Sequence, residues 1–301
     1  MRVAVVACRS GRDAARDDLY PDDDWPLLVA ALEVVGVDSV RLSWDDDEVD
    51  WRSFDVVVIR SSWDSVDRPV EFLAWSRATT EATTLMNPHA TLEWNLDKAY
   101  LSDLHASGLP VVPTDWVTDE SQWTPPSYEF VVKPSVSGGG RETARYEPDE
   151  GGVARRHARR LLDTGRAVMV QPYVQTVDVE GEAKLVYING EFSHAARVGA
   201  LLGVGEGVLE QPWEKPVPVD EMSPTPAQLD VAERALAAAQ AIVGSSALYA
   251  RVDLVAAPNG DPWLAELELV DPSLLLRVDP TGAERLARAI QAQARPHTHP
   301  D

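Results

Sequence analysis

Lysine is scarce in this chain. Only four of its 27 basic residues are lysine, at positions 98, 133, 184 and 215, and the others are arginine. Arginine presents a flat fork of donors, whereas lysine presents a compact charge with rotatable donors. A chain that prefers arginine this strongly is expected to keep lysine mainly where a compact ammonium is needed. The lysine positions are therefore the first places to look for functional residues.

Cysteine and long apolar runs are also lacking. The single cysteine, Cys8, cannot form an intramolecular disulfide, and its apolar surroundings in residues 3–8 predict a buried, unreactive thiol. No stretch approaches the roughly 20 apolar residues of a membrane span. The N-terminus has no apolar signal-type segment, because charged residues begin at Arg9. We therefore expect a cytoplasmic protein with no membrane partner.

Positive charge is in short supply as well. The formal net charge is −22. Nucleic acids and anionic membranes bind basic surfaces, so neither is expected as a partner. Most of the acidity is expected to be a solvated surface that keeps the protein soluble. A few of the acids remain candidates for holding metal.

Strand and helix patterns alternate in the first third of the chain. Short apolar runs predict strands, and longer segments between them predict helices. The expected strands are 3–7, 37–42, 55–59 and 83–86, and the expected helices are 25–35 and 69–77. Such alternation is typical of βαβ units and a parallel sheet, so the fold class is expected to be α/β.

Polar residues follow the third expected strand. Ligands of open parallel sheets bind beyond the carboxyl ends of the strands. Arg60, Ser61, Ser62 and Trp63 occupy that place and are candidates for contact with a substrate. The alternative is that Arg60 pairs with a nearby acid and that Trp63 packs.

The remaining chain mixes helices with hairpins, so an α+β arrangement is expected there. Asn189-Gly190 is a strong two-residue turn signal between the expected strands 183–188 and 192–198. Further strands are expected at 128–132, 167–170, 248–255 and 263–269, and helices at 92–105, 150–163, 227–243 and 282–294.

Lys133 ends an apolar strand just before a glycine-rich segment, Ser137-Gly138-Gly139-Gly140. Glycines let a backbone approach a ligand closely and point its N–H groups at phosphate oxygens. A flexible surface turn is the alternative, but the ammonium upstream favours a phosphate site. The segment is no P-loop, because no Gly-Lys-Ser/Thr opens a helix here.

Three acids lie on two late strands. Glu266 and Glu268 are two residues apart and share a strand face, where carboxylates repel unless a cation or donors lie between them. Asp253 lies on the preceding strand, across a Pro-Asn-Gly-Asp turn, and strand pairing would bring it opposite the glutamates. Mg²⁺ prefers carboxylates, water and substrate phosphates. A magnesium site is therefore predicted, the alternative being the polar face of a half-exposed strand.

The hairpin adds further charged candidates. Alternation puts Glu182 and Lys184 on one face, and Arg197 ends the second strand. A lone arginine is usually a surface residue. With a phosphate site nearby, however, a bidentate grip of Arg197 on a phosphate is expected.

The order of these features resembles the ATP-grasp superfamily, ligases that include glutathione synthetase, D-alanine–D-alanine ligase and the ribosomal-protein glutamate ligases. The resemblance covers nearly the whole chain, and it rests on the ordered set because no single motif is specific. Within the superfamily, segments 60–64, 94–98 and 266–268 look most like a bacterial branch that includes the cyclo-ligase forming D-cycloserine from O-ureido-D-serine.

The resemblance implies roles in binding ATP. Lys98 and Lys133 would bind its phosphates, and residues 137–140 would form a flexible flap over them. A hinge would hold adenine, and a neighbouring acid would lie near the ribose. The hinge residues would be Gln171, Tyr173 and Val174, and the acid would be Glu182.

The resemblance also implies roles in the chemistry. Lys184 and Arg197 would face the γ-phosphate or the substrate. Asp253, Glu266 and Glu268 would hold Mg²⁺, with two ions expected and Mn²⁺ able to substitute. Many members of the superfamily carry Asn where Glu268 stands, so this position departs from the common pattern.

The resemblance further implies a domain plan. A pre-ATP-grasp domain would span residues 1–92, the small ATP-grasp subdomain 93–170 and the C-terminal subdomain 171–295, before a disordered tail at 296–301. The implied activity is ATP- and Mg²⁺-dependent C–N bond formation on a small amino-acid-like substrate, with ring closure of O-ureido-D-serine as one form of it. The alternatives are an intermolecular carboxylate–amine ligase and a non-catalytic nucleotide-binding sensor. A homodimer is common among related ligases.

Overall fold

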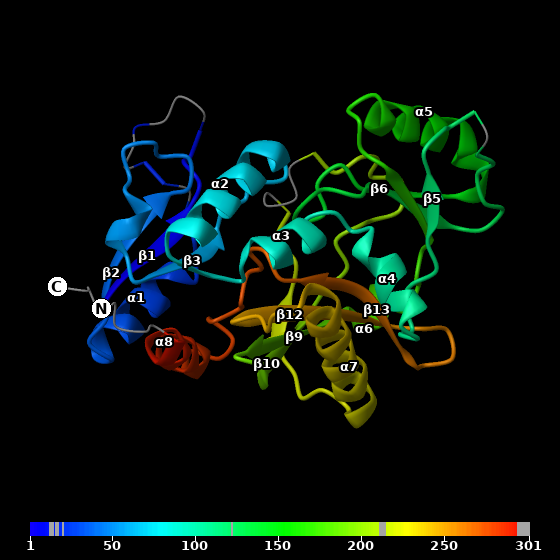
Figure 1. The fold of residues 1–301 in the computed structure, drawn as a ribbon. Helices are drawn as coiled ribbons and strands as arrows, with labels where there is room; N and C mark the ends of the chain where they lie inside the picture. Colours follow the sequence, from blue (N-terminus) through cyan, green and yellow to red (C-terminus); the bar gives the residue numbers. More distant parts are fainter. Residues whose placement is uncertain (12–14, 16–17, 20, 122, 211–214, 294–301) are drawn as a thin grey trace.

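Three β-sheets organise the fold, with helices packed on them (Figure 1). The structure is a computed structural model, and it describes residues 1–11, 15, 18–19, 21–121, 123–210 and 215–293. One sheet is parallel and two are antiparallel. The predicted α/β class with an α+β C-terminal part is confirmed. The predicted tail at 296–301 lies outside the described residues.

The parallel sheet forms the N-terminal part, and its central strands are covered on both faces. Its order is β2-β1-β3-β4, with the strands β1 Arg2–Ala7, β2 Asp38–Ser43, β3 Val56–Ser61 and β4 Thr84–Met86. Helix α1 (Trp25–Val34) covers one face together with the last helix, and α2 (Pro69–Ala82) covers the other. Burial on both faces explains why β1 and β3 carry unbroken apolar runs, at 3–7 and 56–59, rather than alternating.

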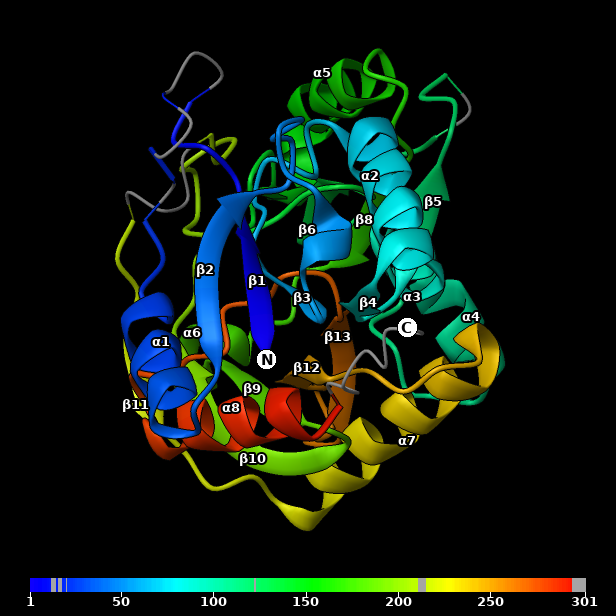
Figure 2. The same ribbon diagram turned by 60° about the vertical axis from the view of Figure 1, so that its left-hand side comes forward.

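The last helix, α8 (Thr281–Gln293), returns to this first sheet. Leu286 and Ile290 of α8 share one apolar core with Val3 and with Leu28 of α1. Figure 2 shows α8 beside α1. Helix α8 also contacts strands β9 and β10 of the third sheet, which is described below. The two ends of the chain are thus packed together, which fixes the first sheet against the central one.

The second sheet has the order β5-β8-β6-β7. Its strands are β5 Asp115–Val117, β6 Phe130–Pro134, β7 Ala144–Tyr146 and β8 Val168–Pro172. Helix α5 (Gly151–Leu162) packs on one face through Ala154 and Leu161. The sequence did not predict β5 and β7, because a three-residue strand is too short to show an alternation.

The third sheet lies at the centre of the molecule and has the order β11-β10-β9-β12-β13. Its strands are β9 Glu182–Ile188, β10 Glu191–Val198, β11 Val219–Glu221, β12 Tyr249–Ala256 and β13 Pro262–Glu268. Asn189 and Gly190 both have positive φ, at 52° and 80°, as the predicted two-residue hairpin requires. Helix α7 (Pro226–Val243) covers one face of this sheet. The other face carries the polar residues described below.

One predicted helix is wrong. Residues 92–105 do not form a continuous helix but belong to α3 (His89–Asn95) and α4 (Tyr100–Ala106), and Lys98 lies between them. The N–H of Lys98 donates to the carbonyl of Ser135 at 2.9 Å instead of to a helical carbonyl. The break therefore ties this segment to the second sheet and directs Lys98 towards it. One further short helix, α6 (Val177–Glu180), links the second sheet to the third.

Asn95, at the end of α3, holds the end of β13. Its amide nitrogen donates to the carbonyl of Leu267 at 2.8 Å, and its amide oxygen accepts the N–H of Leu269 at 2.7 Å. These two bonds flank Glu268. The backbone that carries the acidic pair is thereby fixed by a buried side chain from a distant segment.

Replacing Asn95 by alanine should destabilise the protein. The carbonyl of Leu267 and the N–H of Leu269 would lose these partners inside the protein, so we expect the free energy of unfolding to fall by about 1–3 kcal/mol. Urea unfolding followed by circular dichroism measures the loss. Asn259→Ala, at the exposed turn between β12 and β13, is the matched control and should cost no more than about 0.5 kcal/mol. Equal losses in both variants would contradict this account.

Candidate active site

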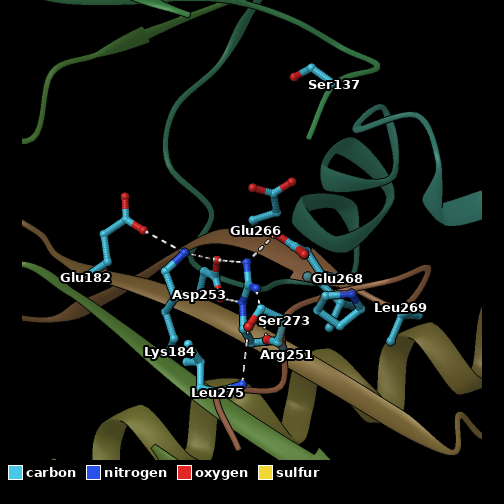
Figure 3. Close-up of polar contacts among 12 residues, drawn as sticks. Ser137, Glu182, Lys184, Arg251, Asp253, Glu266, Glu268, Leu269, Ser273 and Leu275 are labelled. Carbon is cyan, nitrogen blue, oxygen red and sulfur yellow. Dashed lines mark hydrogen bonds and ion pairs between the residues drawn. The ribbon is translucent and has the colours of Figure 1, made fainter. Parts of the chain in front are cut away.

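Three carboxylates meet where β12 and β13 pair. Asp253 lies directly opposite Glu266, and Glu268 lies opposite Arg251, which confirms the predicted register of the acids. One oxygen from each of Asp253, Glu266 and Glu268 lies within 4.8 Å of the others (Figure 3). Asp253 is buried, and the two glutamates are half-buried. Carboxylate oxygens at this spacing are the donors that Mg²⁺ prefers, so the donor set fits such an ion.

Two lysines, one on β9 and one between α3 and α4, neutralise these acids. Lys184 on β9 places its Nζ 2.8 Å from Asp253 and 3.2 Å from Glu182. Lys98 places its Nζ 3.1 Å from Glu266 and donates to the carbonyl of Ser137 at 2.6 Å. The predicted convergence of the scarce lysines on the late acids is therefore found in the structure.

Lys133 on β6 differs from the other two lysines. Its side chain is half-buried, and among the described residues it makes no hydrogen bond or ion pair. Burial lowers the pKa of its ammonium, while the charges of Glu266, Glu182 and Asp253 oppose that shift. A desolvated ammonium without a partner is unfavourable.

Arg251 is a site residue that the sequence analysis missed. Its guanidinium donates to both oxygens of Asp253, at 2.8 and 2.9 Å, and it also contacts Glu268 and the carbonyl of Ser273. Arg251 precedes Asp253 by two residues on β12 and therefore shares its face. The sequence did contain a signal for this role, namely an arginine two residues before Asp253 inside an otherwise apolar strand.

Arg197 does not join the site, and the prediction that it faces the phosphates is wrong. In β10 it pairs with Ala183, whose side chain packs on the α7 side of the sheet, and Arg197 is exposed. A bulge between Phe192 and His194 shifts the register of the hairpin by one residue. Without the bulge, Arg197 would lie opposite Glu182, on the face of Lys184. A one-residue shift exchanges the two faces of a strand.

The three acids do not titrate alike. Burial works to raise the pKa of Asp253, but Arg251 and Lys184 outweigh it and lower that pKa to about 2. Lys98 and Lys133 likewise outweigh burial at Glu266 and lower its pKa. At Glu268, burial raises the pKa to about 7, against the opposing charge of Arg251. Glu268 is therefore the acid that holds a proton near neutrality.

The glycine-rich segment lies over the acids. Lys98 joins the two, because its Nζ donates to the carbonyl of Ser137 and pairs with Glu266, and Figure 3 draws Ser137 on the other side of Glu266 from Asp253. Gly139 and Gly140 have positive φ, at 62° and 81°, and a Cβ at Gly140 would lie 2.6 Å from Leu201. Gly138 and Gly139 are exposed. These glycines therefore give the segment both its shape and an open backbone surface.

The remaining predicted nucleotide residues lie where the chain passes from the second sheet to the third. Gln171 donates to Thr114 at 2.8 Å, and Tyr173 lies under the guanidinium of Arg145 at 3.4 Å from its ring centre. Val174 packs against a small apolar cluster, and Glu182 opens β9. Their roles with adenine and ribose stay predictions.

The candidate substrate residues at the end of β3 are mostly buried. Arg60 is 2% exposed, donates to the carbonyl of Pro272 at 2.8 Å and lies 3.4 Å from Asp24. Ser61 and Ser62 are buried, whereas Trp63 is 39% exposed. The expectation that Arg60 touches a substrate is not met in this structure, because the segment after β13 covers it.

Sequence and structure comparisons place this site in a known context. Residues 3–87 match the family described as the N-terminal domain of the D-cycloserine synthetase DcsG. The chain is 37% identical over 290 residues to the cycloserine biosynthesis protein DcsG of Streptomyces lavendulae, a match that covers 91% of this chain and 95% of that protein. The chain belongs to the DcsG family of ATP-grasp ligases.

Solved structures agree with this assignment. The crystal structure of D-cycloserine synthetase DcsG has a TM-score of 0.86 and 34% identity to this ligase, covering 98% of this chain and 100% of that one. D-Alanine–D-alanine ligase from Bacillus anthracis, complexed with ATP, has a TM-score of 0.64 at 13% identity and covers 98% and 97% of the two chains. PsnB, complexed with its minimal precursor, Mg and ADP, has a TM-score of 0.61 at 18% identity, with 98% and 97% covered. These last two share the fold with this ligase.

The family fixes the general chemistry. The protein is an ATP-dependent carbon–nitrogen ligase, and ATP-grasp ligases use ATP and Mg²⁺. Among the described helices, none is both long enough and apolar enough to cross a membrane.

Binding of Mg²⁺ should depend on pH through Glu268. A metal needs the ionised carboxylate, whereas Glu268 is protonated below its pKa of about 7. We therefore expect the Mg²⁺ affinity of the ADP-bound protein to fall by up to about tenfold per pH unit below pH 7. Calorimetry at pH 8, 7 and 6 measures it.

Glu268→Gln is the control for that pH series. The nucleotide phosphates titrate too, so the informative quantity is the difference between the wild-type profile and the variant profile. The variant should retain only the slope due to the nucleotide. Identical slopes in the two proteins would contradict the assignment of this proton to Glu268.

Proposed function

We propose that the protein activates a small amino-acid-derived substrate with ATP and closes a C–N bond by attack of an amine. The γ-phosphoryl group passes to a carboxylate oxygen of the substrate and ADP leaves. The amine nitrogen then attacks the carbonyl carbon, expels phosphate and loses a proton. The similarity to DcsG favours ring closure of O-ureido-D-serine to D-cycloserine as the reaction, and hence a place in antibiotic biosynthesis. The attacking nitrogen is then the N–H bonded to the side-chain oxygen, and the carbamoyl group (CONH2) that it carries is removed by water as ammonia and carbon dioxide.

One observation carries the proposal beyond the family assignment. Lys133 presents a half-buried ammonium that has no hydrogen-bond or ion-pair partner among the described residues, and it lies beside an acidic trio whose members pair with Lys98, Lys184 and Arg251. The oxygens of a metal-bound triphosphate would give this ammonium a direct partner. We infer that Lys98 and Lys133 bind the ATP phosphates while the flap of residues 137–140 excludes water from the activated substrate.

The cations of the central sheet act on the reacting groups in this proposal. Lys184 and Arg251 lie on the same face of the sheet as Asp253, and in this proposal Arg251 takes the place that the sequence analysis gave to Arg197. Its fork grips both oxygens of Asp253, so Arg251 would act by fixing that carboxylate and by its charge. Mg²⁺ bound by Asp253, Glu266 and Glu268, most simply as two ions and replaceable by Mn²⁺, would offset charge on the phosphate oxygens. No nucleophilic serine or cysteine is required, because positioning and charge stabilisation suffice.

An ADP-release assay tests the substrate and the reaction together. O-Ureido-D-serine alone with ATP should release ADP and phosphate and yield the ring, whereas an intermolecular ligase would need a second amino acid or peptide. Nucleotide binding without ADP release across an amino-acid panel would instead favour a sensor. The homodimer found among related ligases is checked by light scattering of the same preparation.

Lys133→Met should separate catalysis from stability. Methionine keeps the buried stem and removes an ammonium that has no partner among the described residues, so the melting temperature should hold or rise. The value of kcat/KM for ATP should fall by about 100-fold or more, because a cation facing the phosphates is lost. Unchanged turnover would refute the phosphate role.

Arg251 and Arg197 form a matched pair on the two faces of one sheet. Arg251→Lys keeps the charge but loses the fork, so we expect kcat to fall by about 100-fold. Arg197→Lys, exposed on the α7 face, should leave kcat unchanged. The reverse pattern in ADP-release kinetics would restore the role predicted from the sequence for Arg197.

A further inference from the structure

A further carboxylate, Asp271, follows the acidic trio along the chain. Asp271 follows β13 and accepts a hydrogen bond of 2.9 Å from the hydroxyl of Ser62, at the carboxyl end of β3. Its side chain is half-buried. Among the described residues no lysine, arginine or histidine nitrogen lies within ion-pair distance of it.

The nearest cation is committed elsewhere. Arg60 uses Nη2 to donate to the carbonyl of Pro272 at 2.8 Å and to pair with Asp24 at 3.4 Å, while its Nε and Nη1 have no hydrogen-bond partner among the described residues. None of these nitrogens lies within ion-pair distance of Asp271, so the charge of Arg60 acts on that carboxylate only from a distance. Burial raises the pKa of Asp271 to about 6, and the nearby charge of Asp64 adds to that shift. A carboxylate kept in such surroundings is unfavourable by itself. A cationic ligand would remove the cost.

The neighbouring acid Asp64 shows what a satisfied carboxylate looks like here. One of its oxygens accepts from Trp44 Nε1 at 2.7 Å, and the other lies 3.2 Å from Arg68. Asp64 therefore has its cation within the protein, and Asp271 does not. Of these two neighbouring acids, Asp271 is therefore the candidate for binding a cationic ligand.

The segment after β13 links Asp271 to the reacting groups. Arg251 contacts Asp253 and Glu268 and also donates to the carbonyl of Ser273 at 3.2 Å, two residues beyond Asp271. Between Asp271 and Ser273, the carbonyl of Pro272 accepts a hydrogen bond from Arg60. A substrate lying along this segment meets cations where its carboxylate is activated and an anion at Asp271. That polarity suits an amino acid.

We propose that Asp271, oriented by Ser62, binds the substrate ammonium that does not react. This inference rests on the proposed function. O-Ureido-D-serine carries three kinds of nitrogen: the α-amino group, the N–H bonded to oxygen and the terminal NH2 of the ureido group. Only the N–H bonded to oxygen closes the ring. A carboxylate paired with the α-amino group favours its charged form. Asp271 thus selects an amine-bearing substrate and fixes the position of its α-carbon.

Two compounds that differ only in the amine provide the test. ADP release is measured with O-ureido-D-serine and with 3-(ureidooxy)propanoate, which lacks the α-amino group. The wild-type protein should prefer the amine in kcat/KM by about 10- to 100-fold, as for a charge-assisted hydrogen bond. Asp271→Asn should abolish that preference, mainly through KM, and should leave calorimetric binding of ATP unchanged.

Two further variants guard against a purely structural effect. Ser62→Ala keeps the carboxylate but removes its anchor, so the preference for the amine should fall only partly. Asp64→Asn changes an acid that already has its cation, and the preference should persist even if stability drops. Circular dichroism verifies that each variant is folded.

The outcomes separate this inference from the proposed function. A wild-type preference that survives in Asp271→Asn overturns the inference alone, as does a wild-type protein that turns over both compounds equally. A wild-type protein that binds ATP but releases no ADP with either compound overturns the proposed substrate, and the inference falls with it.

Discussion

The charge balance around Asp253 is the constraint on which the rest of the cleft depends. This carboxylate is 2% exposed and is held between Lys184 and Arg251, so it stays ionised despite its burial. Removing a single partner from such an arrangement would leave a buried charge, which costs more than the pair contributes. The positions of its partners are therefore tightly coupled, and the strands that carry them have little freedom to shift register.

That constraint extends outwards through shared partners. Arg251 contacts Asp253, Glu268 and the segment after β13. Lys98 contacts Glu266 and the glycine-rich segment. Each cation thus joins the acids to a different part of the chain. A bound metal–triphosphate would compete for these contacts. Its binding would therefore change the hydrogen bonds of the flap and of the segment that contacts the first sheet.

The segment after β13 gives this fold its link to the N-terminal sheet. Asp24 at the start of α1 accepts the N–H groups of Leu274 and Leu276, and Arg60 holds Pro272. The first sheet therefore contributes to the cleft through the backbone it orients rather than through the arginine that the sequence suggested. Asp271 is the group that this arrangement leaves facing the substrate in our proposal.

Sequence reasoning succeeded where the physical signal is local. Strand periodicity placed Glu266 and Glu268 on one face, the Asn189-Gly190 turn predicted the hairpin, and the scarcity of lysine pointed to Lys98, Lys133 and Lys184. The resemblance to ATP-grasp ligases joined these signals into one site, and the family assignment is confirmed. Roles of individual residues remain predictions.

Tertiary structure decided what depends on register and on distant partners. One bulge in β10 turns Arg197 away from the cleft, because an inserted residue exchanges the faces of a strand and leaves no mark in the periodicity. The helix break at Lys98 follows from a hydrogen bond to Ser135, and the burial of Arg60 follows from a segment more than 200 residues later. The sequence by itself determined which charged residues could contribute to the site. Packing determined which of them lie there, because the pairing of strands across the sheets is settled only when the whole chain is folded.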